Sequence, residues 1–185
     1  MQLSKVITAG LVTLAFVAGG ASAQSDKAKK QAEVLKAAET SLADFSKADP
    51  KIKAELEKAP GYAVFTTYGL SFIIGGAGGK GVVHNRATKT NTFMELAQAS
   101  AGLQIGASDT RYLFIFKDAA SMQQFIDKGW DASAAVAVGA GAAGKSDGGS
   151  VGSFTGGKFY QLTKTGLQAG VAAGGTKVWK DKDLN

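Results

Sequence analysis

The chain of 185 residues contains no cysteine, a single histidine and two prolines. Without cysteine it forms no disulfide bond, no thiolate metal site and no lipid attachment at an N-terminal cysteine. His84 has no second histidine to share a metal ion with, and we interpret it as a polar residue of a strand or turn. The acidic residues lack calcium-loop spacing, so we expect no metal and no cofactor.

Glycine is missing from residues 24–60. The first 23 residues hold three of the 25 glycines, and the other 22 all lie between Gly61 and Gly175. Glycine weakens a helix interior by about 1 kcal/mol relative to alanine, but it suits turns and close backbone approach. The chain therefore divides into a helical arm, residues 24–60, and a β-rich body, residues 61–185.

Long apolar runs are also scarce. The longest, residues 6–17, is shorter than the roughly 20 residues that a membrane-spanning helix needs. Lys5 precedes this run and Ala21-Ser22-Ala23 follows it, as in a secretory signal peptide. We predict a signal peptide over residues 1–23, cleavage after Ala23, and one mature domain over residues 24–185. Export of a chain without cysteine favours a bacterial periplasm.

The formal net charge of +6 is spread thinly, with no run of five or six basic residues. This distribution argues against a nucleic-acid partner and leaves a mild attraction to anionic surfaces. Lys27, Lys29 and Lys30 stand near the start of the helical arm and are the candidate lipid-binding residues. Each lysine near an anionic membrane contributes about 1 kcal/mol, and the apolar stripe of residues 35–45 would add burial at the membrane.

The hydrophobic pattern predicts an α+β fold. Residues 25–48 favour a helix, and Asp49 followed by Pro50 marks the start of a second, short helix. Strands are predicted at residues 62–68, 70–74, 81–85, 101–107, 111–116, 158–163 and 167–173. Residues 111–116 are apolar on both faces, as in a central strand covered on both sides. Asp118 and Gly129 bracket one further helix at about residues 118–128. We expect the N-terminal helices to pack on a glycine-rich, strongly twisted, barrel-like antiparallel sheet of about six to eight strands.

Three glycine-rich segments imitate motifs of enzymes. Residues 139–146 match the sequence pattern of a phosphate-binding loop, and residues 76–81 match that of a dinucleotide-binding loop. Neither segment is followed by residues that favour the helix which these motifs need. Residues 148–152 fit a nucleophile elbow without the helix that it needs. We therefore predict no catalytic residue, no nucleotide partner and no enzyme, with a Ser/His hydrolase as the weakest alternative. Glu95 is interpreted as an outward-facing strand residue, with a buried functional carboxylate as the other possibility.

Four segments of the body occur in an order that resembles the SYLF domain family: residues 59–65, 75–83, 99–107 and 166–171. The resemblance covers roughly residues 31–178. It implies a non-catalytic domain that binds phosphoinositide-containing membranes, partly through an N-terminal amphipathic helix. Eukaryotic members also regulate actin, a role that we do not expect in a periplasm.

The expected partner is thus an anionic phospholipid membrane surface. Two alternatives stay open. One is an envelope protein that binds another protein through its glycine-rich surface. The other is a small outer-membrane barrel, which the helices predicted inside the body and the polar residues 180–185 disfavour.

Overall fold

The computed structural model describes residues 19–72, 76–99, 110–131, 144–146, 149–163, 166–168 and 176–185. These residues form three helices and ten strands. The predicted strand at residues 101–107, most of the one at 167–173, and residues 139–143 of the phosphate-loop motif lie outside the described residues. The helices are α1 (Gly19–Ala48), α2 (Pro50–Lys58) and α3 (Ala119–Lys128). The strands are β1 (Gly61–Phe72), β2 (Gly76–Asn85), β3 (Thr90–Ala99), β4 (Arg111–Phe116), β5 (Trp130–Asp131), β6 (Gly144–Ser146), β7 (Gly149–Phe154), β8 (Gly157–Thr163), β9 (Gly166–Gln168) and β10 (Thr176–Lys180).

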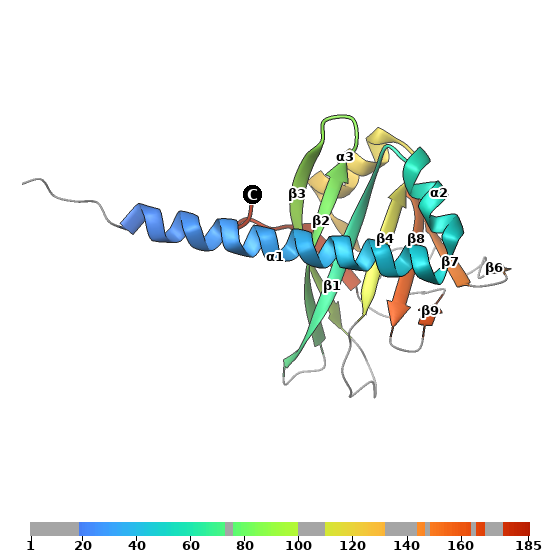
Figure 1. Ribbon diagram of the computed structural model, residues 1–185, viewed down its shortest axis with the longest axis horizontal. Helices are drawn as coiled ribbons and strands as arrows, with labels where there is room; N and C mark the ends of the chain where they lie inside the picture. The colour runs from blue at the N-terminus through green and yellow to red at the C-terminus, as the bar shows by residue number, and fades with distance from the viewer. Residues whose placement is uncertain are drawn as a thin grey trace, which may run out of the picture.

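All ten strands belong to one curled antiparallel sheet (Figure 1), in the order β5-β10-β3-β2-β1-β4-β8-β7-β6, with β9 also paired to β8. Within this described set no pairing joins β5 to β6, so the strands form a half-barrel. The predicted fold class is confirmed. The strand number exceeds the predicted six to eight because β5, β6 and β9 have only two or three residues and because β10 was not among the predicted strands.

Helices cover both faces of the sheet. α1 crosses one face with α2 beside it (Figure 1), and Phe45 and Ile52 from these helices are fully buried in one core cluster with Val64 and Leu113 of the sheet. α3 packs its apolar side on the opposite face, where Phe125 joins a second cluster. The second cluster also contains Ala63, Phe65, Val83, Met94, Leu96, Tyr112, Phe114, Phe116, Met122, Ile126, Phe159 and Val178. The sheet is therefore buried between two apolar layers.

Strand β4 has the position that its composition predicts. It lies between β1 and β8. Leu113 and Ile115 enter the core cluster under α1 and α2, whereas Phe114 and Phe116 enter the one under α3. A strand with large apolar residues at successive positions, here Tyr112 to Phe116, needs partners on both faces, and the helices supply them.

Both predicted helix starts are confirmed. The Asp49 side chain accepts a hydrogen bond from the Lys51 backbone N–H at 2.9 Å, and Pro50 follows at the first helical position. Asp118 accepts from the Ser121 N–H at 2.6 Å. Gly129 ends α3 with φ of +73°, a conformation that glycine adopts without steric cost.

The dinucleotide-like segment of residues 76–81 forms the first part of β2, so its glycines serve strand packing. A Cβ atom added at Gly81 would lie 2.3 Å from Cδ1 of Phe65 and 2.4 Å from the backbone oxygen of Val64. At Gly78, on the same strand, an added Cβ would lie 3.9 Å from the backbone oxygen of Leu96, an ordinary contact. Gly81 is thus required by close approach to β1.

Replacing Gly81 by Ala should lower the free energy of unfolding by about 1–3 kcal/mol, because the new methyl group overpacks the contact with Phe65 and Val64. Urea unfolding followed by circular dichroism measures this change. Gly78→Ala on the same strand is the matched control and should stay within about 0.5 kcal/mol of the unaltered protein. Equal effects of the two substitutions would contradict the role given to Gly81.

Candidate functional site

The residues after β10 fold back onto the sheet as a short turn, residues 181–185, which we call the C-terminal turn. The Asp181 N–H donates to the Phe93 backbone oxygen at 3.0 Å. The Asn185 side chain donates to the same oxygen at 2.7 Å and accepts from the Phe93 N–H at 2.9 Å. Asp181 Oδ1 accepts from the N–H groups of Asp183 and Leu184 at 2.9 and 3.1 Å. These bonds fix the turn against β3.

A chain of polar contacts joins this turn to three neighbouring strands. Lys80 Nζ on β2 lies 2.6 Å from Asp181 Oδ2 and also pairs with Glu95 on β3. Glu95 in turn accepts a hydrogen bond from Trp179 Nε1 on β10 at 2.7 Å. Lys80 and Glu95 are cross-strand partners, as are Glu95 and Trp179. The four side chains therefore form one continuous network.

The network stabilises its charges. The Asp181 side chain is 1% exposed. Burial raises its pKa, but the hydrogen bonds from Lys80 and from the N–H groups of Asp183 and Leu184 outweigh this effect, so the pKa lies below the usual 3.8. Burial lowers the pKa of Lys80, and its bonds to Asp181 and Glu95 raise it above the usual 10.5. Both shifts favour the charged pair.

The N-terminal half of α1 lies against the C-terminal turn. Lys27 Nζ donates to the Asn185 backbone oxygen at 2.6 Å, and Gln31 Nε2 donates to the Leu184 backbone oxygen at 2.7 Å. Lys29 and Lys30 are exposed on the same stretch of helix. Of the three predicted lysines, the structure thus brings Lys27 to the turn.

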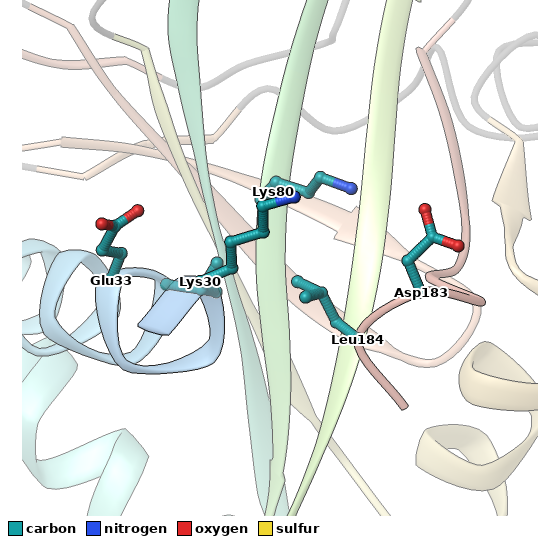
Figure 2. A pocket seen from close by; sticks show the side chains of 6 residues that line it. Lys30, Glu33, Lys80, Asp183 and Leu184 are labelled. Carbon is teal, nitrogen blue, oxygen red and sulfur yellow. The ribbon is translucent and has the colours of Figure 1, made fainter. Parts of the chain in front are cut away.

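Lys30 lines a pocket of about 290 Å³ between α1, β2 and the turn. Figure 2 shows Lys30 reaching from α1 toward Lys80, while the Glu33 carboxylate points to the other side. Leu184 from the turn also points into the pocket (Figure 2), and Val34 lines it from the helix. Asp183 is the remaining lining residue. The pocket thus combines apolar surface with charged groups.

One part of the sequence-based hypothesis needs correction. The apolar stripe of α1 was expected to enter a membrane, but it packs on the sheet of its own chain. Ala38 is 6% exposed and Phe45 is fully buried, and Leu35 and Leu42 pack partly buried against the same core. A membrane therefore meets α1 through its polar side unless the helix leaves the sheet.

Sequence reasoning identified Glu95 as a strand residue that is not buried, and this is confirmed, since its side chain is 30% exposed. It missed Lys80, Asp181 and Trp179. Lys80 and Asp181 are 101 residues apart, and the dinucleotide-like segment that contains Lys80 gives no sign of this pairing. Only the folded sheet brings them together.

Other kinds of site find no support in the described part of the chain. There, no group of three histidine or acidic side chains is arranged to hold a metal ion. Over the same ranges, no helix is long and apolar enough to cross a membrane.

The C-terminal half of the chain matches a known protein family. Residues 97–185 match the Ysc84 family, described as a Las17-binding protein actin regulator. This part of the chain is a Ysc84 domain, also called SYLF. The matched region includes β4, α3, β10 and the C-terminal turn, and its first residue lies inside β3. The sheet continues across this boundary through β2 and β1.

A curated relative extends the comparison beyond the Ysc84 match. The chain is 33% identical over 148 residues to Beta cell expansion factor A of Aeromonas veronii. The alignment covers 80% of this chain and 56% of that protein, so the chain spans about half the length of the relative. Ysc84 domains bind lipids and are generally non-catalytic.

Replacing Asp181 by Asn keeps the side-chain shape and removes the charge paired with Lys80. The free energy of unfolding at pH 7 should fall by about 1–3 kcal/mol. Since the folded-state pKa of Asp181 lies below 3.8, the stabilisation is complete above the unfolded-state pKa and is lost as the pH falls through the folded-state pKa. The difference between the two proteins should therefore vanish on acidification, as urea unfolding at a series of pH values would measure.

Asp183→Asn, at an exposed position of the same turn, is the control and should unfold like the unaltered protein. If Asp181→Asn stayed equally destabilised at acid pH, the effect would come from packing and the account of the charge pair would be wrong.

Proposed function

We propose that this protein binds the head groups of anionic phospholipids at a membrane surface, as a non-catalytic protein of the bacterial periplasm. The observation that carries the proposal is the exposed ammonium group of Lys30 at the rim of a small pocket. Support also comes from the Ysc84 domain, whose members bind lipids. The predicted signal peptide over residues 1–23 motivates the compartment.

The two lysines of the pocket differ in availability. Lys80 is held by Asp181 and Glu95, so its charge is already balanced. Within the described ranges Lys30 has no ion-pair partner, and neither does its exposed neighbour Lys29. Lys27 donates one hydrogen bond to Asn185, and an ammonium group has two further donors. A phosphate oxygen at the pocket would thus meet the ammonium group of Lys30, with Lys27 one helical turn away on the same side of α1.

The size of the pocket limits what it accepts. Its volume of about 290 Å³ is near the lower end of ligand sites, which start at roughly 300 Å³. It suits a head group with its glycerol carbons, which can contact Val34 and Leu184, and it is too small for two acyl chains. The protein would therefore sit on the membrane surface, with the acyl chains remaining in the bilayer.

Electrostatic recognition of this kind should weaken with salt, because screening shortens the reach of exposed charges. It also needs no reacting group, in agreement with the generally non-catalytic character of Ysc84 domains. The family description names Las17 and actin regulation. For an exported protein we favour the lipid partner over the actin one.

The test is co-sedimentation of the processed protein with vesicles of phosphatidylcholine alone or mixed with phosphatidylglycerol. We expect binding to the anionic vesicles only, with the bound fraction falling as salt is raised. Lys30→Gln should weaken the association about fivefold, corresponding to about 1 kcal/mol per lysine at an anionic surface. The bound fraction at a series of lipid concentrations gives the association constant.

Lys53→Gln is the matched control, because Lys53 is an exposed lysine of α2 that does not line the pocket. It should bind like the unaltered protein. Equal losses in the two variants would show that only overall charge matters. No binding to either vesicle would overturn the proposal and favour a protein partner in the envelope.

A further inference from the structure

Trp179 on β10 is the one large hydrophobic side chain that stands exposed in the described residues, at 39%. We propose that Trp179 anchors the protein in the head-group layer of an anionic membrane, beside the Lys30 pocket. This inference rests on the proposed function and adds a second contact to the same surface.

The position of Trp179 follows from the polar network. Lys30 and Lys80 line one pocket, Lys80 pairs with Glu95, and Glu95 accepts the indole N–H of Trp179. The three network residues occupy one cross-strand row on β2, β3 and β10. Neighbouring strands lie about 4.8 Å apart, so the backbones of Lys80 and Trp179 are separated by roughly 10 Å. A membrane over the pocket also reaches Trp179.

The charges around Trp179 suit an anionic surface. Lys177 is exposed on the same strand two residues earlier, so its side chain shares the face of Trp179, and its ammonium group lies 3.6 Å from Asp131 Oδ2. Lys180 and Lys182 follow and are also exposed. Glu95 shares the single positive charge of Lys80 with Asp181, so its own charge is only partly balanced, and the exposed lysines supply the attraction to a negative head group. An exposed aromatic ring among lysines complements lipid phosphates better than it complements an acidic or purely apolar partner.

The indole itself has the character of an interfacial residue. Its N–H is satisfied by Glu95 at 2.7 Å, while part of its ring remains in solvent. Tryptophan is enriched where a membrane meets water because one end of the ring is polar and the other apolar. Trp179 therefore needs no rearrangement of the sheet to enter the head-group layer.

The second tryptophan is an internal control. Trp130 is half-buried and packs against Phe114 and Phe159, with ring centroids 5.1 and 6.0 Å apart. It belongs to the core under α3. The chain has two tryptophans in all, so replacing either one leaves a single fluorescent reporter.

The experiment mixes the Trp130→Phe protein with phosphatidylglycerol-containing vesicles whose lipids are brominated on the acyl chain near the glycerol backbone. Bromine quenches tryptophan fluorescence at short range. We expect the emission of Trp179 to shift to shorter wavelength and to be quenched on binding. In the Trp179→Phe protein, the emission of Trp130 should change little.

Trp179→Ala should in addition weaken vesicle association about five- to tenfold, because part of an indole ring loses an apolar contact. If the Trp179→Ala protein folds poorly, the quenching of Trp179 in the Trp130→Phe protein still tests whether Trp179 enters the membrane. Co-sedimentation without quenching would overturn the anchor and leave the proposed function standing. Absence of co-sedimentation would overturn both the Trp179 anchor and the proposed binding of anionic lipid.

Discussion

The carboxylate of Asp181 is the group on which the geometry of the site depends. One of its oxygens binds Lys80, and the other accepts two backbone N–H groups of the C-terminal turn. With the side chain 1% exposed, these bonds offset the cost of burying the charge. The turn therefore has one conformation, and that conformation places Leu184 in the pocket and two backbone oxygens against Lys27 and Gln31 of α1.

The same pair determines which cations remain available. Two carboxylates, Asp181 and Glu95, pair with the single positive charge of Lys80, so the network on β2, β3 and β10 offers no free positive charge. Lysines on α1 and β10 supply exposed positive charges beside it. Trp179 is held on this outer surface by Glu95. A buried ion pair thus organises an exposed basic surface without being part of the proposed contact with lipid.

The sequence predicted the elements with strong local signals and missed contacts between distant residues. The capping residues Asp49 and Asp118 mark helices α2 and α3 correctly, and the apolar pattern of β4 predicts a strand covered on both faces. Strand β10 was not predicted because two of its five residues are lysines, Lys177 and Lys180, so its period-two pattern is weak. The pairing of Lys80 with Asp181 spans 101 residues, and no local propensity encodes such a contact. The position of the pocket therefore could not be predicted from the sequence and is known only from the folded structure.

The burial of α1 decides how the protein can meet a membrane. Lifting the helix off the sheet would expose Phe45 and the apolar residues beside it. Each fully buried large apolar side chain contributes about 1.5–3 kcal/mol, whereas a lysine at an anionic surface gains about 1 kcal/mol. The three lysines near the start of α1, Lys27, Lys29 and Lys30, cannot offset the loss of several such contacts. Contact through the intact surface, with the helix in place, is the arrangement of lower free energy, and it keeps the Lys30 pocket and Trp179 on the same preformed surface.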